Sequence, residues 1–344
     1  MRSNLEGERP AARTGQETST AVLSDAAGAR SRSPGARLRG GLGYFFAALR
    51  LHPQFALGYA IVVLVMLIAL LAPWLAPYSP VTADPSQYLL PPGWAHPMGT
   101  DASGMDILSR VMFAPRIDLT IAVLGTLVSA TIGTFLGALV GYYQSARGLR
   151  ALACDAIVRA SDVLQAFPVF VFAIALVAIF GQSIQSIIAA IAFVNIPIYL
   201  RLTRSQVMTV RGMRYVEAAI VCGVGDLTII RRHAIPNAMA PVLAQLSVNI
   251  GFAIILTAAL SFVGAGVRAP TPEWGSMIAM GFQNVTTGQW WPSVFPGLAL
   301  AITVFGFALV GASVEFLADR RLREKGRPLR YASWSYLRSD LHPD

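Results

Sequence analysis

The chain has 344 residues, of which 55% are hydrophobic and only 13% are charged, and its net charge is +9. A soluble globular domain carries about a quarter charged residues, so this composition excludes that class and indicates an integral membrane protein. The positive charge does not indicate nucleic-acid binding, because the basic residues flank apolar runs, where Lys and Arg mark cytoplasmic loops and contact anionic lipid.

The first 50 residues contain no apolar run and are rich in Ser, Ala, Gly and Arg. This composition predicts a disordered cytoplasmic tail over residues 1–42, with no cleavable signal peptide. The first apolar run then acts as the insertion signal.

Six uncharged apolar runs are long enough to cross about 30 Å of hydrocarbon. They predict an all-α integral membrane protein with a transmembrane domain over residues 43–323, followed by a second tail over 324–344. The predicted spans are about 55–76, 119–142, 163–180, 184–200, 240–263 and 295–314. Of the 27 Lys and Arg residues, 24 fall on the side of the two termini and 3 on the other. This asymmetry predicts that both termini lie in the cytoplasm.

The stretch HPMGTDASGMDILSR (96–110) follows the first span. Its glycines and aspartates predict a tight turn that leads into an interfacial helix toward the second span. A metal site is the alternative, but no soft ligands surround these residues. The turn would be formed by Gly99, Asp101, Gly104 and Asp106, and the ligands of the alternative metal site would be His96, Asp101 and Asp106.

Two prolines and two amides stand out within the spans. Pro168, near the start of the third span, and Pro197, near the end of the fourth, would loosen backbone hydrogen bonds and act as gating hinges or as packed kinks. Gln245 and Asn249 in the fifth span share one helical face. They either line a translocation path or form hydrogen bonds between helices, and the second role is favoured for any single residue.

The stretch YVEAAIVCGVGDLTIIRRHAIPN (215–237) is semi-polar and lies between the fourth and fifth spans. Apolar residues at helical spacing predict a first helix over 208–222. Glycines at 223 and 225 predict a sharp turn. Asp226 is a suitable N-cap for a second helix over 227–233, which has to stop before Pro236. The stretch is therefore predicted to be a helix–turn–helix that projects from the membrane.

This loop resembles the EAA loop of binding-protein-dependent ABC importer permeases, in which Glu-Ala-Ala, Gly and Leu-Pro recur at fixed distances. The resemblance implies that the loop carries a coupling helix for a cytoplasmic ATPase. Glu217 would contact the ATPase or brace the hairpin, Gly223 would supply the turn, and Pro236 would end the hairpin. The residues of the candidate coupling loop are Glu217, Ala218, Ala219, Gly223, Asp226, Ile235 and Pro236.

The 96–110 stretch is similar to a segment of dipeptide, oligopeptide and nickel importer permeases, with Met98 for Leu and Met105 for Arg. Further similarity extends over about residues 44–323. It implies the type I importer fold, a bacterial inner-membrane location, and three partners: a second homologous permease, ATPase subunits and an extracytoplasmic binding protein. Di- or oligopeptides are the expected substrates, and nickel or glutathione-type substrates are the alternative.

Missing motifs argue against other functions. The chain has one lysine, Lys325, and no phosphate-binding P-loop, so ATP hydrolysis has to occur in another subunit. It has no zinc-protease motif and no serine-hydrolase elbow, which argues against an enzyme, and no cofactor or metal is expected.

Cys154 and Cys222 fall on the cytoplasmic side and predict no disulfide. Proton- or ion-coupled carriers usually keep charges at the centres of their spans, and these spans have none. A self-sufficient secondary transporter or channel, or a subunit that only anchors other proteins, remains a rival interpretation.

Overall fold

The computed structural model describes residues 45, 48–144 and 147–318. The chain divides after His52 into two units, and the second unit holds nearly all described residues. In the first unit, residues 45 and 48–51 are helical. The predicted tails over residues 1–42 and 324–344 lie outside the described residues, so neither is compared with the structure.

The described part of the second unit is helical, apart from loops and one isolated bridge between Thr100 and Asp106. In chain order, its elements are α3 (Pro53–Leu75), η1 (Pro85–Gln87), α4 (Ile107–Tyr143), α5 (Leu149–Ala166), α6 (Val169–Phe180), α7 (Ile184–Arg211), α8 (Arg214–Val221), α9 (Asp226–Ile229), η2 (Ile230–Ala234), α10 (Ile235–Phe262), α11 (Trp274–Phe282), η3 (Val285–Thr287) and α12 (Trp291–Ala318).

Among the described residues, five helices are long and apolar enough to cross a membrane: α3, α4, α7, the run through α9 and α10, and α12. The pair α5 and α6 meets this criterion only together, and it is bent by 96°. The described chain thus has five spans, or six if the bent pair counts as one. The predicted all-α membrane fold is confirmed, and its orientation stays a prediction.

Several helices differ from the predicted spans. The second predicted span starts at 119, but α4 begins at Ile107. Asp106 caps the helix there, so the polar residues before 119 are part of α4. The third predicted span, 163–180, is divided between α5 and α6, since the helix breaks at Phe167 and Pro168. Proline disfavours helical backbone at the residue before it, which explains the break.

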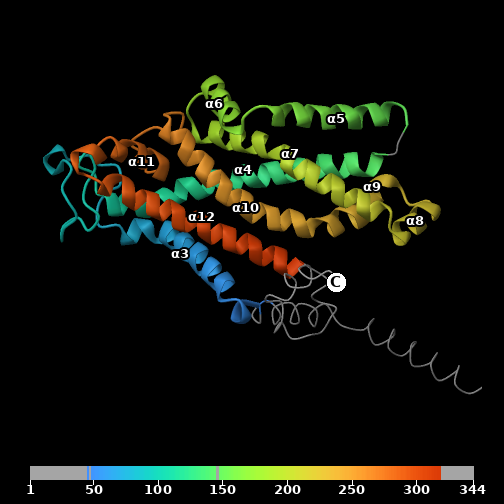
Figure 1. Cartoon of the computed structure of the whole chain (residues 1–344), viewed down its shortest axis with the longest axis horizontal. Helices are drawn as coiled ribbons and strands as arrows, with labels where there is room; N and C mark the ends of the chain where they lie inside the picture. The colour runs from blue at the N-terminus through green and yellow to red at the C-terminus, as the bar shows by residue number, and fades with distance from the viewer. Residues whose placement is uncertain (1–44, 46–47, 145–146, 319–344) are drawn as a thin grey trace, which may run out of the picture. The chain divides into compact units, whose positions relative to one another are not determined.

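Helices α4 and α7 lie side by side (Figure 1) and make extensive contact. Their backbones approach closely because glycines recur every four residues on the facing side of α4, a pattern typical of helix pairs in membranes. A Cβ atom on Gly133 would lie 2.6 Å from the carbonyl oxygen of Ile196, and one on Gly141 would lie 2.7 Å from that of Arg204. Side chains larger than hydrogen therefore do not fit at these positions.

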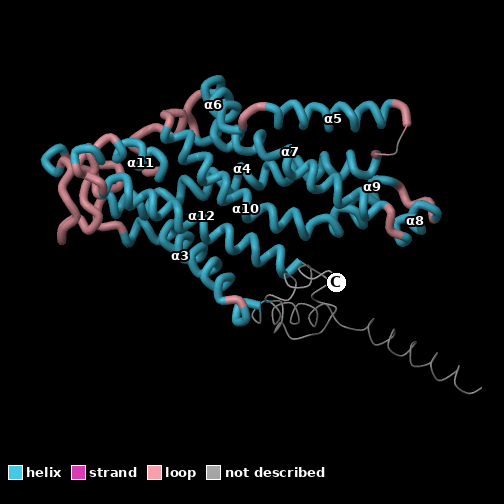
Figure 2. The backbone as a smooth tube through the Cα atoms, viewed as in Figure 1, coloured by secondary structure: helices cyan, strands magenta, loops and turns pink. Residues whose placement is uncertain are grey.

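Non-helical residues gather at one end of the bundle, around α11 (Figure 2), while α8 and α9 lie at the other end (Figure 1). We call residues 76–106 together with 263–290 the cap, and residues 214–236 the hairpin. The long helix α4 runs from the cap to the neighbourhood of the hairpin.

Candidate functional site

The hairpin starts with a break that the sequence does not predict. The single helix expected over 208–222 is wrong, because α7 ends at Arg211 and α8 begins at Arg214. Gly212 and Met213 separate the two helices, and the N–H of Gly212 donates to the carbonyl of Val210. The break turns α8 away from the axis of α7, so that Val216 becomes buried, at 1% exposure, in a cluster with residues of α4 and α7.

The chain turns after α8 at Gly223, which has a φ of +75°. The N–H of Gly223 donates to the carbonyl of Ile220 at 2.9 Å, and the N–H of Val224 donates to that of Ala219 at 3.1 Å. These two bonds form a Schellman motif, in which the residue after the C-cap takes left-handed backbone. Among the described residues, apart from Gly223 itself and its two neighbours in the chain, no atom lies within 4 Å of the position of a Cβ on Gly223. The conformation, and not lack of space, therefore favours glycine here.

The outer surface of the hairpin is open and carries both polar and apolar side chains. Glu217 and Ala218 are exposed, and Ala219 is half-buried. Within the described residues, the Glu217 carboxylate has no hydrogen bond or ion pair. Glu217 therefore does not brace the hairpin within the described part of this chain, which leaves the carboxylate available to a partner.

A shallow hollow of about 310 Å³ follows on the second half of the hairpin. Two arginines and two residues of α9 line it: Leu227, Thr228, Arg231 and Arg232. Beneath it, Ile229 and Ile230 are buried in the same apolar cluster as Val216. The hairpin thus packs on the ends of α4 and α7 with its inner side and presents a semi-polar surface on its outer side.

Asp226 does not act as the predicted N-cap. Gly225 occupies the cap position of α9, and Asp226 is the first helical residue. Its carboxylate instead accepts hydrogen bonds from the hydroxyls of Tyr142 at 2.9 Å and Tyr143 at 3.2 Å. The prediction fails because these tertiary donors at the end of α4 take the oxygens that a cap would use.

The second predicted helix also does not stop before Pro236. A π-helical turn, η2, leads into α10, and the helix continues to Phe262. Proline removes one backbone hydrogen bond and clashes with the preceding turn of an α-helix. The wider π turn, with its i to i+5 bonds, lies where that clash would occur. Pro236 is exposed and Ile235 is half-buried, and both lie in the first turn of α10, so neither residue ends the helix.

The remaining candidate residues lie in the helical bundle and not in the hairpin. Pro168 is the N-cap of α6, at the 96° bend. Pro197 is buried inside α7, which continues past it to Arg211. The Nε2 atom of Gln245 donates to Oδ1 of Asn249 at 2.8 Å, a bond within α10 and not between helices. These residues do not form one site with the hairpin.

At the other end of the bundle, residues 96–110 form a turn whose side chains bond each other. Nδ1 of His96 lies 2.9 Å from Oδ1 of Asp106. Asp106 also accepts the backbone N–H of Ser109 at 2.8 Å and so caps α4, which takes the place of the predicted interfacial helix. Asp101 accepts two backbone N–H groups of the turn. Nearby in the cap, two hydrogen bonds from Ser86 hold the pKa of Asp84 below its ordinary value.

Arg110 joins distant parts of the cap. Its guanidinium is fully buried, and its Nη1 atom donates to the carbonyls of Pro80 at 2.9 Å and Pro270 at 3.3 Å. Its Nε atom lies 3.6 Å from a carboxylate oxygen of Asp101. A buried cation needs such partners, because isolated charge is costly in a low-dielectric interior. Arg110 therefore connects both loop segments of the cap to the start of α4.

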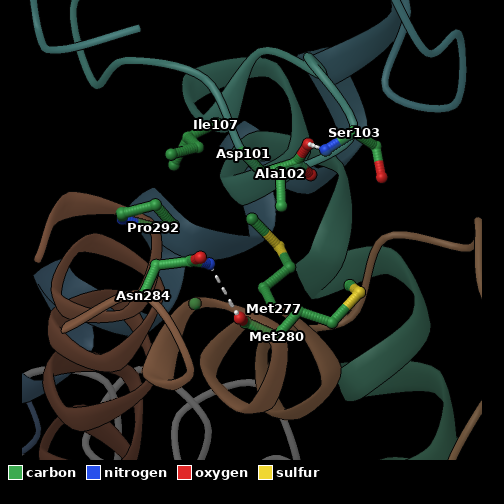
Figure 3. A pocket seen from close by; sticks show the side chains of 9 residues that line it. Asp101, Ala102, Ser103, Ile107, Met277, Met280, Asn284 and Pro292 are labelled. Atoms are coloured by element: carbon green, nitrogen blue, oxygen red, sulfur yellow. Dashed lines mark hydrogen bonds between the residues drawn. The ribbon is translucent and has the colours of Figure 1, made fainter. Parts of the chain in front are cut away.

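The hollow next to this turn is small. Figure 3 shows the residues that line it, with the amide of Asn284 donating to the carbonyl of Met280 at 3.2 Å. Its volume is about 20 Å³. A cavity of roughly 10–15 Å³ is needed for one water molecule, so this space does not accommodate an organic solute. The lining residues are Asp101, Ala102, Ser103, Ile107, Met277, Met280, Gly281, Asn284 and Pro292.

Sequence reasoning missed several residues at both ends. Tyr142 and Tyr143 end an apolar run, and no local pattern links them to Asp226, which lies more than 80 positions later. Asp118 directly precedes the second predicted span, yet it is buried in α4, where it accepts the backbone N–H of Trp274 at 3.2 Å. The only available signal was the presence of polar residues at the edge of an apolar run.

Known proteins match most of the chain. Residues 133–324 match the family described as the binding-protein-dependent transport system inner membrane component. Residues 42–92 match the N-terminal transmembrane domain of oligopeptide transport permease C. The "Probable D,D-dipeptide transport system permease protein DdpC" of Escherichia coli (strain K12) is 39% identical over 260 residues, covering 75% of this chain and 85% of that protein.

Two further proteins resemble the chain. The glutathione transport system permease protein GsiD of Pectobacterium atrosepticum is 36% identical over 276 residues, covering 80% of this chain and 89% of that protein. A solved structure of the methionine ABC transporter MetNI in an inward-facing conformation has a TM-score of 0.48 and 18% identity, covering 64% of this chain and 97% of that one.

Proposed function

This chain belongs to the family of binding-protein-dependent transport inner membrane permeases, and we propose that it is the second permease subunit of an ATP-driven importer for di- and oligopeptides. Members of this family are multi-pass proteins of the inner membrane without an ATPase domain. The energy for uptake has to come from ATPase subunits, and a second permease and an extracytoplasmic binding protein complete the importer.

The hairpin is the observation that carries the coupling role. It is held from within by Val216, Ile229 and Ile230, and it leaves Glu217 exposed and without a partner in the described chain. A semi-polar surface on a firmly packed base fits a docking site for another protein. The Lys and Arg distribution supports a cytoplasmic position for this surface, on the same side as an ATPase.

In this mechanism, ATP binding closes the ATPase dimer and displaces the hairpin. Gly223 keeps α8 and α9 at a fixed angle, so that the two helices move together. Because the π turn η2 continues into α10, displacement of the hairpin also reaches the helical bundle. The bundle then opens toward the binding protein and receives the substrate.

Peptides are the proposed substrates because the N-terminal match is to an oligopeptide permease and the first relative is named for a D,D-dipeptide. Glutathione is the second candidate, since a relative of similar identity is named for it. Nickel complexes remain an alternative from the resemblance of residues 96–110. The binding protein does most of the selection, so the permease alone does not distinguish these substrates.

Reconstitution in liposomes tests this function. The complete importer, purified through a tag on this chain, is compared with the chain alone, using radiolabelled L-Ala-L-Ala, D-Ala-D-Ala, glutathione and ⁶³Ni²⁺. We expect uptake of a dipeptide that requires enclosed ATP, the ATPase and the binding protein. Uptake by the chain alone, driven by an ion gradient, would instead establish a secondary transporter.

A further inference from the structure

The carboxylate of Asp226, in α9, lies next to the ends of α4 and α5. Each of its oxygens accepts a hydroxyl from α4, with Tyr142 at 2.9 Å from Oδ1 and Tyr143 at 3.2 Å from Oδ2. The guanidinium of Arg150, at the start of α5, lies 3.6 Å from Oδ2. One side chain of the hairpin thus contacts the ends of two helices of the bundle.

Cations hold the two tyrosine rings in place. The guanidinium of Arg211, the last residue of α7, lies 5.1 Å from the ring centroid of Tyr142 and donates to the backbone carbonyl of the same residue. The guanidinium of Arg150 lies 5.2 Å from the ring centroid of Tyr143. The two rings meet edge to face, with centroids 5.1 Å apart. These ring contacts orient the two hydroxyls toward the carboxylate of Asp226.

The tyrosines, and not the arginine, carry this contact. The side chains of Arg150 and Asp226 are 69% and 45% exposed, and an ion pair so open to water contributes little. Hydrogen bonds to an ionised carboxylate are stronger than neutral ones, and Tyr142 is buried. The apolar cluster beneath the hairpin also stabilises its packing, but hydrophobic contacts are not directional. The two hydrogen bonds are directional and therefore fix the position of α9 against α4.

We propose that Tyr142, Tyr143 and Asp226 form a latch that passes displacement of the hairpin to α4. This inference rests on the proposed coupling function and assigns to it residues outside the hairpin. Helix α4 suits the role because its 37 residues run from the latch to the cap, where Arg110 connects its start to both loop segments. Displacement of the hairpin then moves the opposite end of the bundle through one continuous helix.

The variant Tyr142→Phe/Tyr143→Phe tests the latch, because it removes both hydroxyls and keeps both rings. The complete importer is purified and reconstituted, and ATP hydrolysis and uptake are measured with whichever substrate of the above panel the wild-type importer accumulates. We expect unchanged amounts of co-purified ATPase, continued hydrolysis, and an approximately tenfold fall in substrate transported per ATP. The matched control Tyr88→Phe, an exposed tyrosine in the cap, should keep the wild-type ratio.

A double-mutant cycle with Asp226→Asn separates a latch from general loosening. If the carboxylate and hydroxyls act together, adding Asp226→Asn to the double tyrosine variant changes the transport ratio no further. Asp162→Asn, which removes an exposed carboxylate of α5, serves as the charge control. Multiplicative losses, an unchanged ratio in the tyrosine variant, or loss of the ATPase from the purified complex would each overturn the latch.

The latch and the coupling function fail in distinguishable ways. If the hairpin is the coupling site and the latch is wrong, Gly223→Asp abolishes uptake while the tyrosine variant transports normally. If the hairpin is not the coupling site, uptake survives Gly223→Asp as well, and both proposals fall.

Discussion

The cap and the hairpin each turn at a glycine with positive φ, but the surroundings of the two glycines are opposite. Gly104 in the cap has a φ of +73°, and a Cβ there would overlap the backbone carbonyl of Asp84. Gly223 in the hairpin has a φ of +75° and open space around it. One turn is enclosed by the rest of the protein, while the other is free on the surface.

Charged residues differ in the same way. Arg110 and Asp106 of the cap region are buried and have partners within the chain. Glu217 and Arg231 of the hairpin are exposed. Removing one partner of a buried charged contact is strongly destabilising, whereas exposed charges on a packed base are available to another protein. The cap is therefore expected to matter for stability and the hairpin for assembly and transport.

Gly104→Ala should have the largest effect on the fold. Left-handed backbone costs a non-glycine residue about 1–2 kcal/mol, and the overlap with Asp84 should raise the loss of unfolding free energy above about 4 kcal/mol. The thermal midpoint in detergent, measured by size-exclusion chromatography, checks this. Gly288 also has left-handed backbone but has open space around it, so Gly288→Ala should lower the unfolding free energy only by the backbone cost of about 1–2 kcal/mol. Equal losses at both sites would contradict the enclosed cap.

Arg110→Gln should follow, because the shorter neutral side chain leaves the carbonyls of Pro80 and Pro270 without their donor. Breaking a buried charged contact costs about 3–5 kcal/mol. The same thermal measurement should show a large decrease, whereas Arg116→Gln, at an exposed position of α4, should change little. A stable Arg110→Gln protein would mean that the cap does not depend on this contact.

Gly223→Asp should spare the fold and abolish uptake. Aspartate tolerates left-handed backbone better than most residues and meets no atom here, but it alters the turn between α8 and α9 and adds charge to the docking surface. Membrane levels should remain normal while uptake by the complete importer falls to background. The matched variant Gly288→Asp, in the cap, should transport normally. Normal uptake with Gly223→Asp would remove the coupling role.

Glu217→Gln should have the smallest effect. An exposed substitution changes stability by less than about 0.5 kcal/mol, while loss of a charged hydrogen bond weakens ATPase binding by about tenfold. Titration of the ATPase onto the permeases in nanodiscs measures this affinity. Glu315→Gln, an exposed position on α12, is the control. Unchanged affinity would show that another hairpin residue makes the contact.

The sequence by itself determined the class of protein, the positions of most spans and the turn at Gly223. These features depend on local properties: the length of apolar runs, the distribution of Lys and Arg, and the conformations that glycine permits. The resemblance of residues 215–236 to a coupling loop also came from local spacing; the match shows the family that this resemblance names, and the coupling role itself stays a prediction.

Only the tertiary structure decided how the polar side chains are used. The sequence around Asp226 is typical of a helix N-cap, yet its carboxylate accepts hydrogen bonds from two tyrosines more than 80 positions away. A proline at position 236 predicts the end of a helix, yet a π turn precedes it and the helix continues through Pro236. Both outcomes depend on which groups the fold brings together, because a polar side chain takes the strongest partner within reach and a helix adjusts where packing favours its continuation.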